Sequence, residues 1–115
     1  MKTDGFGRQL DFEDVSAKDL IYSQDQQRAV TWHVSRHRED RFDEDTDFEI
    51  IVFDVSTKTA IKRLYRSHRY HHDTHAEEGK YIVAVTFGLN LNEIIIHGHD
   101  DSMDGSQELV LIEKS

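Results

Sequence analysis

Hydrophobic and polar residues alternate along much of the chain with the period of a β-strand. In residues 28–35, Val30, Trp32 and Val34 are separated by polar residues, as expected for a strand with one buried face. Residues 48–55 (FEIIVFDV) form a β-branched and aromatic run that is typical of a central strand. A polar, acidic connection over residues 36–47 lies between them. The two segments are therefore predicted to form a hairpin with a long loop.

Three further strand-like segments follow in the second half of the chain. They are residues 80–87 (KYIVAVTF), 93–97 (EIIIH) and 108–113 (ELVLIE). Glycine and asparagine in residues 88–92 favour a turn, and Asp104 with Gly105 is a strong hairpin-turn signal. This order predicts an antiparallel β-meander.

Residues 56–75 fit two structures. Ile61, Leu64 and His68 lie on one face of an amphipathic helix over residues 57–70. Alternatively, residues 60–67 pair with residues 48–55 through a Ser-Thr-Lys-Thr turn. The expected fold is mainly β, an antiparallel meander or sandwich-like sheet, and a short helix around 57–70 would make it α+β.

The length of 115 residues indicates a single domain over 1–115, in which residues 1–15 are expected to form a loosely ordered N-terminal arm. Hydrophobic residues make up 37% of the chain and charged residues 32%, which predicts a small core beneath a well-solvated surface. No cysteine is present, so disulfides and thiolate metal sites are excluded. Together with the lack of a long apolar stretch, this predicts a soluble cytoplasmic protein that does not enter membranes.

The formal net charge of -9 affects which partners are expected. An acidic surface repels phosphate backbones and anionic lipid, so direct binding to nucleic acid is disfavoured, whereas a protein partner with a basic surface would be attracted. The basic residues Lys62, Arg63, Arg66 and Arg69 alternate with tyrosines, a pattern also found in RNA-binding segments. The preferred interpretation is that Lys62, Arg63 and Arg66 neutralise the acidic loops of the same domain or of a neighbouring subunit.

Two parts of the chain resemble WD-type β-propeller repeats. Residues 20–67 and 81–113 each contain a strand, an acidic loop and a second strand. Tyr22 to Asp25 and Val85 to Phe87 are similar to the turn and strand patterns of that family, and Phe53 to Thr57 to its blade-closing strand. The resemblance implies antiparallel meanders and, because two blades cannot close a ring, the assembly of several chains into a homo-oligomer. The alternative is a β-meander with similar alternation alone.

Candidate metal ligands concentrate near the C-terminus. His97 and His99 are two residues apart at a predicted strand end, so a regular strand would place them on one face. The following loop carries oxygen-bearing side chains at alternate positions before a glycine, as in calcium loops. The predicted site therefore consists of two histidines and four oxygen donors, for calcium or zinc: His97, His99, Asp100, Ser102, Asp104 and Glu108.

A second histidine cluster lies in residues 68–75 (HRYHHDTH). On a helix, His68, His75 and either His71 or His72 would share one face and could surround zinc or nickel. On a polar loop, the same residues would bind metal only adventitiously.

The sequence contains no nucleophile elbow, phosphate-binding glycine loop or identifiable acid–base pair. The favoured function is therefore a small acidic protein-binding module, regulatory or inhibitory and without catalysis. The alternative is a divalent-metal-binding domain with a His/Asp site, which includes a metal-dependent enzyme.

Overall fold

The computed structural model describes residues 10–38, 43–90, 93–102 and 104–114. It is an antiparallel meander of seven strands, in which each strand pairs with its neighbours in sequence. The mainly β fold expected from the sequence is confirmed. Two 3-10 turns, η1 (Phe12–Asp14) and η2 (Ala17–Asp19), precede the strands. The strands are β1 (Ile21–Tyr22), β2 (Arg28–Arg38), β3 (Asp43–Asp54), β4 (Thr59–His71), β5 (Ala76–Phe87), β6 (Glu93–Ser102) and β7 (Gly105–Lys114).

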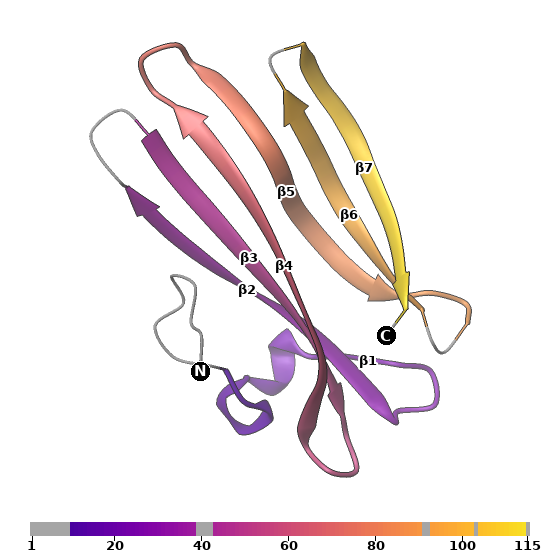
Figure 1. Ribbon diagram of the computed structural model, residues 1–115. Helices are drawn as coiled ribbons and strands as arrows, with labels where there is room; N and C mark the ends of the chain where they lie inside the picture. The colour runs from indigo at the N-terminus through magenta and orange to yellow at the C-terminus, as the bar shows by residue number, and fades with distance from the viewer. Residues whose placement is uncertain (1–9, 39–42, 91–92, 103, 115) are drawn as a thin grey trace.

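The sheet folds over between β4 and β5. These strands pair only from His68 to His71 and from Ala76 to Gly79. They lie side by side at the turn that joins them and separate toward their other ends (Figure 1). The strands β5–β7 consequently form a second layer against β2–β4.

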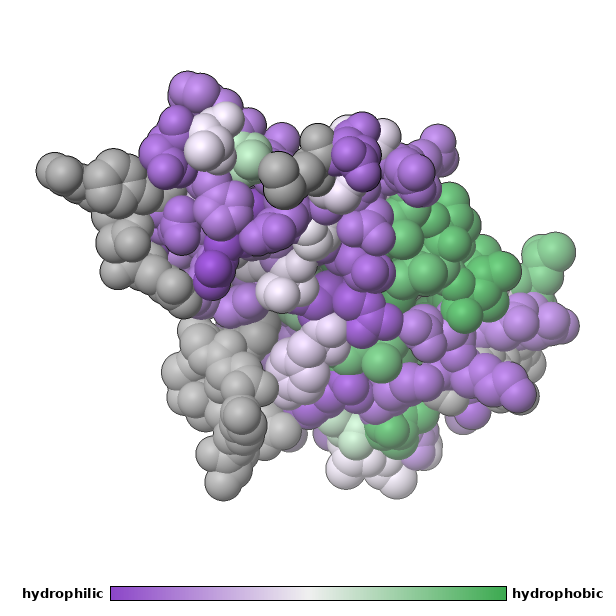
Figure 2. Space-filling view, turned by 45° about the horizontal axis from the view of Figure 1, so that its top comes forward, coloured by the Kyte–Doolittle hydropathy of each residue, from purple (hydrophilic) through white to green (hydrophobic). Residues whose placement is uncertain are grey.

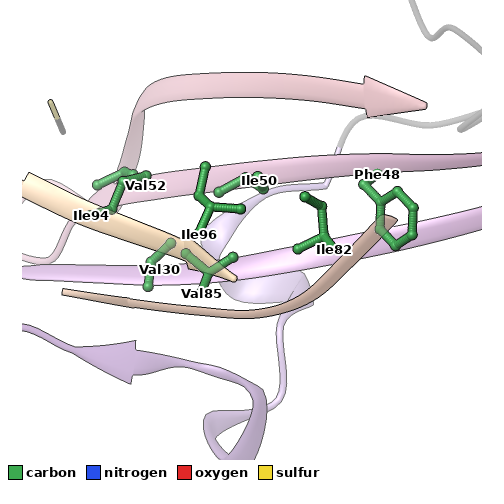
Figure 3. Close-up of a cluster of buried hydrophobic side chains, with 8 residues drawn as sticks. All are labelled: Val30, Phe48, Ile50, Val52, Ile82, Val85, Ile94 and Ile96. Carbon is green, nitrogen blue, oxygen red and sulfur yellow. The ribbon is translucent and has the colours of Figure 1, made fainter. Parts of the chain in front are cut away.

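Aliphatic and aromatic side chains fill the space between the two layers. Figure 3 shows the eight buried residues of this core gathered between strands of both layers. Their burial supplies the main favourable free energy of folding. The core consists of Val30, Phe48, Ile50 and Val52 from β2 and β3, and Ile82, Val85, Ile94 and Ile96 from β5 and β6.

Strand β3, predicted as a central strand, is buried on both faces. Phe48, Ile50 and Val52 enter the core, whereas Ile51 and Phe53 alternate with them and are also fully buried. The segment before β1 packs against the face of β3 that carries Phe53. The ring of Phe12 meets that of Phe53 edge-on, with centroids 5.3 Å apart.

The helix alternative for residues 57–70 is wrong, because this segment forms β4 and pairs with β3. The preceding turn is held by Asp54, whose carboxylate accepts hydrogen bonds from the Ser56 main chain and hydroxyl and from the Thr57 hydroxyl. These bonds hold the pKa of Asp54 below its ordinary value. Lys58 takes the left-handed conformation, with φ of 58°, and completes the reversal.

Within the described residues, no helix has the length and apolar character that crossing a membrane would require.

Candidate functional site

Three polar side chains from two separate strands meet in the interior of the folded sheet. His68 lies on β4, and His99 and Asp101 lie on β6. Their nearest nitrogen and oxygen atoms all lie within 4.8 Å of one another. Two imidazoles and one carboxylate in this arrangement could hold a metal ion.

Gly79 of β5 makes this meeting possible. It pairs with His68 on one side and with Asp101 on the other, so the two side chains approach each other across a residue that has none. Gly79 has φ of +100°, and a Cβ built there would lie only 2.4 Å from the main-chain oxygen of Ser67. Only glycine fits this position without displacement of the backbone.

A β-bulge in β5 lies opposite the point on β6 where the inward-facing positions change. The β5–β6 register shifts between Ile82 and Ala84, where one extra residue is inserted. Along β6, Ile94 and Ile96 enter the core before this irregularity, whereas His99 and Asp101 contact His68 after it. The inward positions are therefore three residues apart at Gly98 instead of two. Bulges commonly re-aim side chains in this way.

Asp101 is the centre of the cluster. Its Oδ2 atom lies 2.7 Å from His68 Nε2, and both side chains are only 5% exposed. His99 Nδ1 lies 2.9 Å from the same oxygen. That nitrogen is buried and makes no hydrogen bond of acceptable geometry to any described residue. An imidazole nitrogen is thus buried beside a carboxylate without being satisfied by it, which is costly unless another group binds there.

The charge state of Asp101 suits a ligand. Burial raises its pKa, but hydrogen bonds from Ser106 and His68 and the charges of the two histidines outweigh burial and place the pKa below the ordinary value. The carboxylate is therefore ionised at neutral pH, which is the state that binds cations.

Aromatic rings fix the orientation of both histidines. Tyr81 stacks on His99, with centroids 5.1 Å apart and an interplanar angle of 7°. The same tyrosine meets His68 edge-on at 5.2 Å and Phe48 edge-on at 5.0 Å. Its hydroxyl accepts a hydrogen bond from Arg36 at 3.2 Å. The ring thereby joins the cluster to the apolar core.

Glu77 adds a further carboxylate beside the cluster. Its Oε1 lies 3.7 Å from His68 Nε2, and its side chain is 51% exposed. The cluster is consequently buried on the core side and open to solvent on the side of Glu77 and of the half-buried His99.

Of the metal ligands predicted from the sequence, His99 alone belongs to this group. His97 is exposed and pairs with Ala84 and Val110. Asp100 forms an ion pair with Lys80 at 3.3 Å. The remaining three serve or flank the β6–β7 hairpin: Ser102 Oγ bonds to the main chains of Asp104 and Gly105, and Glu108 is exposed opposite His99.

The pairing of His68 with Asp101 could not be predicted from the sequence. They are 33 positions apart, and their approach depends on the register of three strands. The common-face arrangement proposed for the four histidines of residues 68–75 is wrong. His68 faces the core, whereas His71 lies between Asp43 and Glu78, 2.9 Å from each. His72 packs edge-on against Tyr70.

Arginines of β4 pair with acidic side chains of the same domain, but these lie in strands β3 and β7 and not in the acidic loops that the sequence interpretation named. Arg63 pairs with Glu49, Arg66 with Glu113 and Arg69 with Asp45. The acidic residues Asp43, Asp45 and Asp47 lie in strand β3 rather than in a loop.

No family model, curated protein or solved structure matches this chain. The resemblance to WD-type repeats therefore stays a prediction.

Proposed function

We propose that this protein is a divalent-metal-binding domain whose ligands are His68, His99 and Asp101. The observation that carries the proposal is the buried Nδ1 atom of His99, which faces Asp101 without a hydrogen bond. A cation between the three side chains would satisfy this nitrogen and would offset the charge of the buried carboxylate.

Zinc suits the donor set better than calcium does. Two imidazole nitrogens and one carboxylate oxygen are typical ligands of zinc and of other late first-row metals, whereas calcium takes six to eight oxygens. The calcium alternative depended on the oxygen-rich loop after His99, and in the structure Ser102 and Asp104 of that loop are used in the hairpin turn.

Metal binding requires a small opening of the cluster. Two ligands at about 2.0 Å from a tetrahedral zinc lie roughly 3.3 Å apart. The present contacts of Asp101 with His68 and His99 are 2.7 Å and 2.9 Å. A shift of about half an ångström, within the reach of side-chain rotation, would admit the ion.

Three protein ligands leave one tetrahedral position. The solvent-facing side of the cluster would supply it, through a water molecule or through Glu77 after rotation of its exposed side chain. A carboxylate there would close the site as in structural zinc sites, whereas water would leave it open. Binding of a basic protein partner, expected from the net charge, stays a prediction.

The test is calorimetric titration of Zn²⁺ into untagged protein stripped with a chelator. We expect one ion per chain, and His99→Ala should weaken binding at least about tenfold, because even the loss of an outer-shell partner of a metal ligand costs about 10- to 100-fold. His97→Ala is the matched control, because His97 is exposed on the same strand two positions away and should leave affinity unchanged.

Circular dichroism of both variants would establish that each retains the fold. Binding of equal affinity in the wild type and in His99→Ala, or loss of binding in His97→Ala alone, would contradict the proposed ligands. Absence of any stoichiometric binding of Zn²⁺, Ni²⁺ or Co²⁺ would overturn the function itself.

A further inference from the structure

Strand β7 forms an edge of the sheet. Among the described residues it pairs with β6 alone, through an uninterrupted register from Gly105 to Lys114 without a bulge. The chain contains no proline that could block further pairing. Edge strands often carry a bulge or a proline, because their unpaired N–H and C=O groups can otherwise pair with another strand.

The outward face beside this edge is apolar. Val110 is 52% exposed and Ile112 is 63% exposed, and Ile112 pairs with the half-buried Ile95 of β6. Figure 2 shows hydrophobic side chains gathered on the side of the molecule where Figure 1 places β6 and β7. An apolar surface of this kind next to a free edge marks an interaction site.

The even-numbered residues 108–114 of β7 are complementary to themselves in one antiparallel register, which also places Leu109 opposite Glu113. With Leu111 on a two-fold axis, Val110 lies opposite Ile112 of the second copy. In the same register Glu108 lies opposite Lys114 of the second copy, so symmetry produces two apolar pairs flanked by two pairs of opposite charge. Centring the pairing on Val110 instead would place Glu108 opposite Ile112. The pattern therefore favours a single register.

We infer that β7 binds β7 of a second copy of this chain, antiparallel and centred on Leu111, to give a symmetric dimer with a continuous sheet. This interaction surface is separate from the proposed metal ligands and does not depend on them. Because β6 and β7 of each copy are joined to the new interface, the outward apolar face would continue from one copy into the other.

Contacts from β4 are compatible with this pairing. Lys62 Nζ donates to the main-chain oxygen of Lys114, and Arg66 pairs with Glu113. Both contacts hold the C-terminal end of β7 against the other layer. A carbonyl oxygen has two lone pairs, so Lys114 can accept a second hydrogen bond from the partner strand.

The dimer should be weak. A single strand pair buries less area than the roughly 1,200–2,000 Å² of stable complexes. We therefore expect a monomer–dimer equilibrium that changes with concentration in the micromolar range or above.

Sedimentation velocity of untagged protein across this concentration range, in the presence of a chelator, tests the inference independently of metal. Glu108→Lys and Lys114→Glu should each weaken dimerisation at least about tenfold, since each creates like charges in two symmetric pairs. The double variant restores opposite charges and should recover most of the wild-type affinity.

Ile112→Lys should abolish the dimer, because it places a charge in the centre of the interface. Val83→Lys, on the same layer but two strands from the edge, is the matched control and should dimerise normally. A wild-type protein that is monomeric at all concentrations would overturn the inference. So would a dimer that survives Ile112→Lys, or a double charge variant as weak as the single ones.

Discussion

His68 of β4 and Asp101 of β6 meet across Gly79, the β5 residue that pairs with both of them. Two strands separated by a third are too far apart for ordinary side-chain contact, at nearly 10 Å. Position 79 has no side chain and its backbone has a positive φ, and His68 Nε2 lies 2.7 Å from Asp101 Oδ2 across it. The site thus depends on a residue that contributes no ligand atom.

Gly79→Ala should destabilise the fold by at least about 2 kcal/mol, because it adds both a disfavoured φ and a clash with the Ser67 carbonyl. Gly105→Ala is the matched control: its φ is also positive, but no atom lies within 4 Å of the added Cβ, so about 1 kcal/mol is expected. Urea unfolding measures both. Equal losses would show that the clash at position 79 is relieved without cost.

Arg63→Met should cost about 2–4 kcal/mol of unfolding free energy. The Glu49 side chain is 3% exposed and would lose its cation, while Arg63 also donates to the Leu10 carbonyl. Arg38→Met removes one member of an exposed pair with Glu44 and should cost less than about 1 kcal/mol. A small effect of Arg63→Met would mean that the Tyr65 hydroxyl, 2.8 Å from Glu49, suffices for this carboxylate.

His71 should titrate above its ordinary pKa of 6.5, because hydrogen bonds to Glu78 and then to Asp43 favour its protonated form. A pKa raised on folding contributes stability that is present below the unfolded pKa. This contribution is lost as pH rises through the higher pKa of the folded state. NMR titration of the imidazole measures the pKa directly, and Glu78→Gln should lower it. An unchanged value in Glu78→Gln would exclude this carboxylate as the main cause.

Phe12→Ala should reduce stability by about 1–3 kcal/mol, since it removes the ring that packs against the fully buried Phe53. The denaturation midpoint should fall while its slope stays constant. A change below about 0.5 kcal/mol would show that the segment before β1 adds little to the core of the sheet.

The strands could be predicted from the sequence, because alternation at Val30, Trp32 and Val34 and the run from Phe48 to Phe53 are local signals. The structure of residues 57–70 could not, since Ile61, Leu64 and His68 fit the period of a helix while residues 60–67 could equally pair with residues 48–55. The hairpin in the structure is stabilised by Asp54, whose side chain accepts hydrogen bonds from Ser56 and Thr57 in the turn before β4.

The site was only partly predictable for a different reason. Grouping His97 with His99 assumed a regular strand, whereas the bulge opposite Gly98 places them in different surroundings. His68 enters the group through strand register, which no pattern within a single segment encodes. His99 could be predicted as a candidate ligand from its own segment, whereas its partner His68 from a distant segment could not.

The meander has a consequence for how the chain acquires its structure. Strands leave the ribosome in the same order in which they lie in the sheet, so every new strand finds its hydrogen-bonding neighbour already present. With no proline in the chain, isomerisation of prolyl bonds cannot delay any of these steps. The two layers can close on each other only once β5 and β6 have been made. Until then the apolar side chains of β2 and β3 face water, which makes the half-synthesised domain the state most exposed to aggregation.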